Sequence, residues 1–138
     1  MELELKHIAP LFPHGLQMEY NGQVGTLTEV HHNECEPNPT RLAVKFDGVR
    51  GCMEPKYIWL FKPVVRPLSQ LTEEITHNGK TFVPIDFLDM YPEDLRIIIK
   101  HGAIEANMNW HDAQKLFEWH FDAFGLIDSG LAIEKPNH

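Results

Sequence analysis

The sequence predicts an α+β fold, in which a small strand-rich half precedes a half built from a β-hairpin and two or three helices. Three dipeptides with the composition of tight hairpin turns interrupt β-prone runs: Asn21-Gly22, Asp47-Gly48 and Asn78-Gly79. Helical periodicity is confined to the second half, beyond the proline-bounded segment Lys62–Pro67. The 138 residues suffice for one ordinary domain or for two small ones that share a core.

Five short strands are predicted from the sequence of the first half. Apolar and polar residues alternate over Leu16–Tyr20 and Leu42–Phe46, and β-prone runs follow the turns at Val24–Val30 and Val49–Met53. Tyr57–Phe61 is a further apolar run and is expected to be a buried strand. Short strands joined by tight turns favour a strongly curved sheet or a small antiparallel barrel.

Two proline-containing segments are expected to lack regular structure. His31–Thr40 contains two prolines and two asparagines, which predicts a loop. In Lys62–Pro67 the prolines fix the backbone and remove hydrogen-bond donors, which predicts a stiff connector. Because this connector is short, we expect the two halves of the chain that it joins, residues 1–67 and residues 68–138, to pack as one body.

The second half begins with short elements. A helical turn is expected at Leu68–Thr72, and Glu74–Val83 predicts a hairpin in which Ile75 faces Phe82 across the ladder. Proline suits the first position of a helix and glycine its end, so a helix is predicted over Pro92–Gly102. Its apolar stripe is formed by Leu95, Ile98 and Ile99.

The longest helix is predicted over Asn109–Leu126. Asparagine at its start is a good N-cap, and Gly125 suits the left-handed position that follows a helix end. Apolar side chains cover a little over half of its circumference, and His120 lies in the middle of that arc beside Trp119. The remaining residues, 126–133, are expected to form an extended or short helical tail.

His120 and Trp119 are the candidate ligand-binding residues. One hypothesis is that a histidine shielded by aromatic rings acts as a ligand or as the general base of a hydrolase. The alternative is a core histidine whose nitrogens meet backbone carbonyls or a buried water. We favour the structural interpretation, because no serine, cysteine or acid stands at a spacing that identifies a partner. The chain also lacks a phosphate-binding glycine loop and a nucleophile elbow, so no catalytic residue is predicted.

The charge is distributed unevenly. Residues 1–67 carry seven Lys and Arg against eight Asp and Glu, and residues 68–138 carry five against twelve. The whole chain has a net charge of −8. An acidic body repels a phosphate backbone and suits a basic protein partner. Nucleic-acid binding is therefore a secondary hypothesis, assigned to the near-neutral half through Lys45, Arg50, Lys56 and Arg66.

No metal or other cofactor is expected. His31, His32 and Cys35 share one loop and Cys52 lies beyond the next turn, but their spacing matches no zinc motif. The sequence shows neither a secretory signal nor an apolar run of membrane-spanning length. With two cysteines, this predicts free thiols and a cytoplasmic protein.

Two patterns resemble known proteins. Residues 22–30, followed after a variable loop by residues 42–48, are similar to the small SH3-like barrels of the Tudor and KOW type. The segments FKPVVRPLSQLT (61–72), HNGKTFVPI (77–85) and LFEWHFDAFGLI (116–127) resemble a family of short uncharacterised proteins encoded in prophages and other mobile elements of Bacteroides-type bacteria. That resemblance implies a phage-related origin in a bacterial host, and it carries over no functional residues.

These observations predict a non-catalytic interaction module. Its expected partner is a host or phage protein, which it modulates, or a small signalling molecule, which it binds. The second hypothesis is a nucleic-acid accessory protein that acts through the SH3-like half. Oligonucleotide binding that weakens as salt rises distinguishes the two.

Overall fold

The computed structural model describes residues 2–37, 39–46, 54–89, 92–101 and 108–135. Its large sheet contains β1 (Gln17–Tyr20), β2 (Gln23–His32), β3 (Thr40–Phe46), β4 (Lys56–Tyr57), β5 (Lys62–Val65) and β8 (Ile133–Glu134). The spatial order is β4-β3-β2-β1-β5-β8, and β6 (Ile75–His77) pairs with β7 (Lys80–Phe82) in a separate hairpin. The α+β class is therefore confirmed. Among the described strands no sheet closes on itself, and the SH3-like barrel is not confirmed.

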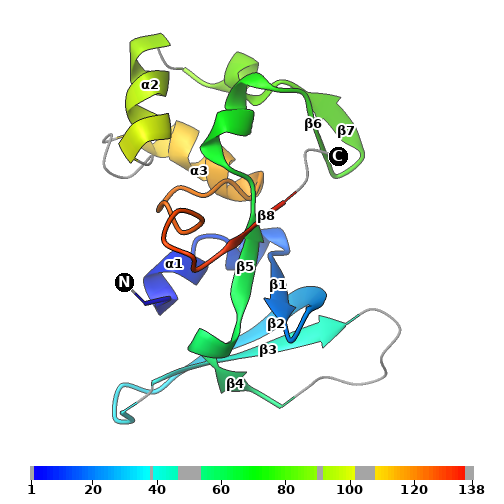
Figure 1. Ribbon diagram of the computed structural model, residues 1–138, viewed down its shortest axis with the longest axis vertical. Helices are drawn as coiled ribbons and strands as arrows, with labels where there is room; N and C mark the ends of the chain where they lie inside the picture. The colour runs from blue at the N-terminus through cyan, green and yellow to red at the C-terminus, as the bar shows by residue number, and fades with distance from the viewer. Residues whose placement is uncertain (1, 38, 47–53, 90–91, 102–107, 136–138) are drawn as a thin grey trace.

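The α-helices are α1 (Leu5–Ile8), α2 (Pro92–His101) and α3 (Trp110–Glu118). The two longer helices, α2 and α3, lie at the end of the molecule opposite β2, β3 and β4, whereas α1 lies nearer the middle (Figure 1). The 3-10 helices are η1 (Phe12–His14), η2 (Ile58–Leu60), η3 (Leu68–Thr72) and η4 (Pro84–Phe87). One cluster of buried side chains joins sheet residues such as Met18 and Leu42 to Leu116 and Phe121 of the helical part. The two parts of the chain thus share a core.

Two of the three predicted tight turns are present as expected. Asn21 and Gly22 have φ angles of 51° and 81°, and Asn78 and Gly79 have φ angles of 51° and 79°. Positive φ at both central residues is what the hairpin turn requires. The predicted pairing of Ile75 with Phe82 is confirmed. The third predicted turn, Asp47-Gly48, and the strand expected after it lie outside the described residues.

The predicted connector is instead a strand at the centre of the molecule. β5 pairs antiparallel with β1 on one side and parallel with β8 on the other. Pro63 fits there because β8 begins to pair only at Val64, so the missing proline donor faces no second strand. β5 runs from the sheet toward the helices (Figure 1), and it therefore links the two halves.

Two other predicted segments have different boundaries. Residues 57–61 do not form a continuous buried strand, because β4 ends at Tyr57 and η2 follows. The expected loop at residues 31–40 is shorter, since β2 continues to His32 and β3 begins at Thr40. In α2, Ile98 is buried as predicted but Ile99 is exposed, so the apolar stripe is narrower than expected.

The last predicted helix begins as expected and ends early. The Asn109 side chain accepts a hydrogen bond from the backbone N–H of Asp112, which confirms the N-cap. However, α3 ends at Glu118, and the prediction that it continues to Leu126 was wrong. Beyond it the chain forms turns and then β8, so the expected tail is extended only at its end.

Candidate functional site

The early end of α3 depends on His120. Its φ angle is 63°, in the left-handed region, and its N–H donates to the carbonyl of Phe117 at 3.1 Å. The N–H of Phe121 donates to the carbonyl of Leu116 at 2.9 Å. These two bonds form a Schellman motif, with a histidine in the position where glycine is most common. Gly125, predicted for this role, also has a positive φ, but it belongs to a later turn.

Arg66, a fully buried residue distant in sequence, holds this end of the helix. Its Nε donates to the carbonyl of Trp119 at 3.1 Å, and its Nη2 donates to the carbonyl of Thr76 at 2.9 Å. Its backbone N–H donates to the carbonyl of His120 at 2.7 Å, and its own carbonyl accepts from Asp122 at 2.9 Å. The chain leaves the helix where the carbonyls of Trp119 and His120 and the N–H of Asp122 bond to Arg66.

Both nitrogens of the His120 ring have close neighbours. Nε2 lies 2.6 Å from the carbonyl oxygen of His14, and Nδ1 lies 3.2 Å from Nζ of Lys135. Because a carbonyl only accepts, Nε2 carries the proton, and Nδ1 accepts from the lysine. Burial lowers the pKa of His120 to about 4, so the ring is neutral near pH 7. One nitrogen thus meets a backbone carbonyl, as in the structural interpretation, whereas the other meets a lysine side chain, which that interpretation did not include.

Further titratable groups surround this ring. The ring of His77 meets that of His120 edge-on, with centroids 5.1 Å apart. Burial lowers the pKa of His77, and the nearby Lys135 and Arg66 lower it further. Burial, followed by Arg66, also lowers the pKa of Lys135. We call His77, His120 and Lys135 the basic cluster. It joins three elements, and its geometry supports a fold-stabilising role.

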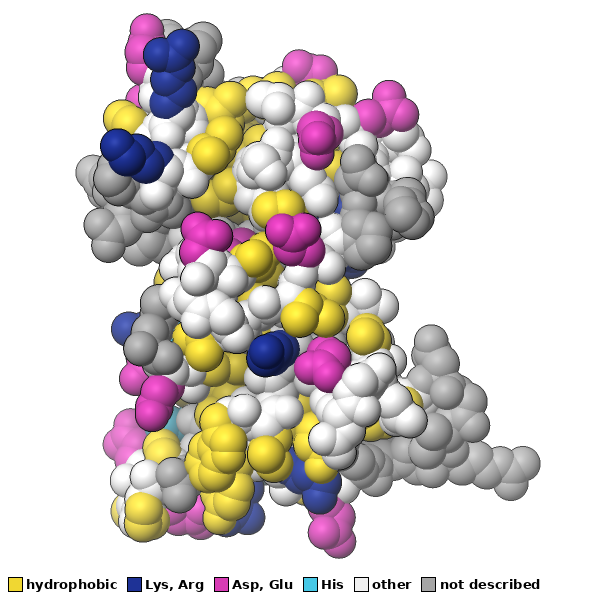
Figure 2. All heavy atoms as spheres, in the orientation of Figure 1, with side chains coloured by type: hydrophobic (Ala, Val, Ile, Leu, Met, Phe, Trp, Pro, Cys, Tyr) yellow, Lys and Arg dark blue, Asp and Glu magenta, His cyan; other side chains and the backbone are white. Residues whose placement is uncertain are grey.

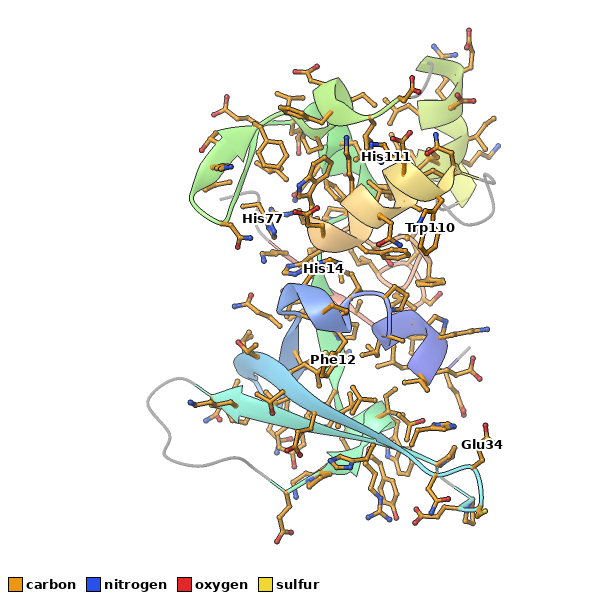
Figure 3. The ribbon with its side chains drawn as sticks, turned by 180° about the vertical axis from the view of Figure 1, so that it is seen from behind. Phe12, His14, Glu34, His77, Trp110 and His111 are labelled. Atoms are coloured by element: carbon orange, nitrogen blue, oxygen red, sulfur yellow. The ribbon has the colours of Figure 1, made fainter. Side chains whose placement is uncertain are left out.

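The other candidates on this segment do not converge with His120. Trp119 is buried against Phe82, with ring centroids 5.1 Å apart, so it packs in the core and lines no described pocket. Figure 3 shows Trp110 and His111 at the start of α3, and His77 and His14 near its other end. Trp110 is 75% exposed, yet it too lies outside the described pockets.

A pocket of about 770 Å³ lies elsewhere, between the N-terminal segment, residues 32–40, η2 and the Gly130–Leu131 segment. Its apolar lining residues are Leu3, Leu5, Pro37, Pro39, Ile58, Trp59, Phe61 and Leu131. Charged lining residues come in balanced numbers, Glu2 and Glu4 against Lys6 and Lys62. A pocket of mixed lining and this size can accept an apolar side chain or a small molecule.

Trp59 lines this pocket, and its ring is part of a stack of side chains. Its ring lies parallel to that of Tyr57, with centroids 4.4 Å apart, and the guanidinium of Arg41 lies 4.9 Å from the Tyr57 ring centre. Arg41 and Tyr57 are paired across β3 and β4, which fixes the stack to the sheet. Trp59 and Leu60 remain 54% and 44% exposed. Figure 2 shows hydrophobic side chains gathered over η2, at the lower end of the molecule.

Sequence reasoning missed this site. An unbroken apolar run from Tyr57 to Phe61 carries no periodicity that separates exposed from buried residues. The exposure of Trp59 follows from the tight 3-10 turn of η2, which places Ile58 in the core and the next two residues outside.

The predicted nucleic-acid residues do not form one surface. Lys45 is exposed on β3 and Lys56 is half-buried on β4, whereas Arg66 is fully buried and has no access to a phosphate backbone. Arg50 lies outside the described residues. Of the four residues assigned to nucleic-acid binding, Arg66 is therefore not accessible in the folded chain.

The histidine-rich turn does not bring metal ligands together in the part of the chain that the structure describes. His31 lies 3.1 Å from a Glu29 oxygen, and His32 Nδ1 lies 2.8 Å from the Thr40 hydroxyl. Cys35 is exposed and free, and Cys52 is outside the described residues.

Comparison with known proteins returns no relative. No protein-family model matches the chain, and neither a curated protein nor a solved structure is detectably similar to it. Within the described residues, no helix has both the length and the apolar character needed to cross a membrane. The chemistry of the site is thus the basis for the functional conclusion.

Proposed function

We propose that this protein is a non-catalytic interaction module, and that the pocket beside Trp59 receives an apolar side chain of a partner protein. The observation that carries the proposal is an exposed tryptophan fixed on Tyr57 at the mouth of a pocket. Tryptophan is prominent among residues that dominate binding energy, because a rigid ring buries a large area at a small cost in entropy. Stacking on Tyr57 holds the ring in place before binding.

The charges around the pocket support a protein partner over nucleic acid. Two acidic and two basic residues line the pocket, and Glu4 and Lys6 lie 3.3 Å apart as an ion pair. Single-stranded nucleic acid is bound by aromatic platforms within a positively charged groove. The lining of the pocket has equal numbers of acidic and basic residues, so it lacks such an excess of positive charge. The net charge of −8 instead favours a basic protein, and the phage-related resemblance makes a host or phage protein the proposed partner.

The test compares the Trp59→Ala and Trp110→Ala variants. Both remove an exposed tryptophan, but only Trp59 lines the pocket. Affinity capture from a bacterial host lysate should retain a protein that the wild type and Trp110→Ala bind and that Trp59→Ala loses. For the purified pair, the Trp59 variant should weaken the affinity by about 30-fold or more, as expected for a central anchor.

Other outcomes contradict the proposal. If Trp59→Ala captures every partner as well as the wild type does, the pocket is not the binding site. If labelled oligonucleotides bind in low salt, and salt together with Trp59→Ala weakens that binding, the nucleic-acid function replaces the proposed one.

A further inference from the structure

The basic cluster is connected to the pocket through the C-terminal segment. Lys135, which contacts His120, directly follows β8. Gly130 and Leu131, which precede β8 by a few residues, line the pocket. β8 is only two residues long, and both residues pair with β5. The position of this pocket wall therefore depends on how firmly the strand is held.

Lys135 makes several of the contacts that keep β8 in place. Its backbone N–H donates to the carbonyl of Val65 at 2.7 Å, and its carbonyl accepts from Gln70 Nε2 at 3.2 Å. Its side chain reaches His120 Nδ1 at 3.2 Å. The bond to His120 exists only while Nδ1 is unprotonated, because two protonated nitrogens cannot share it.

Protonation of either histidine adds positive charge to a site that is already cationic. The charged groups that face His77 and His120 are Lys135, Arg66 and Glu118. The carboxylate of Glu118 is the one acid among them in the described part of the chain, against two permanent cations. The carbonyl of His14 holds Nε2 in either state. An added proton thus repels Lys135, the most peripheral member of the cluster.

We propose that the basic cluster is a proton-sensitive latch: protonation of His77 or His120 releases Lys135 and β8 from β5 and thereby displaces the Gly130–Leu131 wall of the pocket. The effect on partner binding rests on the proposed function, whereas the release of β8 does not. Acid strong enough to protonate one of these rings then weakens the pocket while the rest of the large sheet stays paired.

The test measures hydrogen exchange at single amides by NMR between pH 7 and pH 4 in the full chain without a partner. The amide of residue 135 reports on β8, and the amide of Leu27, which donates to Leu16 at 2.9 Å, reports on the distant sheet. Protection factors, corrected for the intrinsic effect of pH, should fall at least tenfold at residue 135 and by a clearly smaller factor at Leu27, whose exchange follows the overall loss of stability in acid. The indole N–H signal of Trp59, assigned with Trp59→Phe, should shift over the same pH range.

Three variants provide the controls. His77→Gln and His120→Asn remove one titrating ring each, and Asn tolerates the left-handed backbone at position 120. At least one of them should abolish the acid response, and Lys135→Met should show low protection at residue 135 already at pH 7. Constant protection at residue 135, an equal fall at Leu27, or a full response in both histidine variants overturns the latch. Because no partner is present, this result is independent of the proposed function.

Discussion

His120 adopts a backbone conformation that costs a residue with a side chain about 1–2 kcal/mol. The structure retains it because ring and backbone both make contacts that glycine could supply only in part. The ring meets His14 and Lys135, and the carbonyl accepts from Arg66. Strain in one residue is thus offset by bonds to three distant segments.

Glycine and alanine at position 120 should separate backbone strain from ring contacts. Both variants lose the ring, but only His120→Ala keeps the unfavourable φ, so it should be less stable than His120→Gly by about 1 kcal/mol. His111, exposed within α3, is the matched control, since glycine there should be the less stable variant by about 1 kcal/mol. Urea denaturation measures both pairs. The same order at both positions would contradict the left-handed assignment.

Arg66 should be a major determinant of stability. Arg66→Met removes the donors to the buried carbonyl of Trp119 and the half-buried carbonyl of Thr76, and should lower the free energy of unfolding by about 2–4 kcal/mol. Arg96→Met, at an exposed position of α2, should change it by less than about 0.5 kcal/mol. Equal denaturation midpoints for the two variants would show that the buried guanidinium contributes little.

At the scale of elements, the parts of the fold set by local chemistry could be predicted. The two Asn-Gly turns and the Asn109 cap each depend on a few adjacent residues, and all three are present as predicted. β5 could not be predicted, because its partners β1 and β8 lie far away in sequence and its proline argued for a connector. The end of α3 was missed for the same reason, since Arg66 imposes it from 53 residues away.

The Asn109 cap tests whether α3 depends on its own start as well as on Arg66. Asn109→Ala removes the acceptor for the N–H of Asp112 and should cost about 1 kcal/mol, whereas Asn109→Ser should cost much less because serine also caps helices. Thermal unfolding followed by circular dichroism measures both. Equal losses for the two variants would indicate that the cap bond does not matter.

At the scale of the whole molecule, the basic cluster lies where the separate parts meet. β6, the end of α3 and the residue after β8 supply its three members, the carbonyl of His14 in η1 contacts it, and Arg66, the residue after β5, lies beside it. The sequence suggested that His120 was important, but it could not show that its neighbours come from these elements. The Trp59 pocket also combines four separate segments of the chain, so neither site was visible in any one motif.

The stability of the molecule should therefore depend on pH through His120. Its pKa is about 4 in the folded chain and 6.5 in an exposed histidine. Above pH 6.5 both states are neutral there; as the pH falls from 6.5 to 4, the unfolded chain takes up the proton first and folding is penalised. The difference corresponds to a loss of up to about 3 kcal/mol, complete near pH 4. Urea denaturation between pH 7.5 and pH 4 should show a steeper loss for the wild type than for His120→Asn, in which the carboxylates still titrate. Parallel curves for the two proteins would mean that His120 gains a proton as easily in the folded chain as in water.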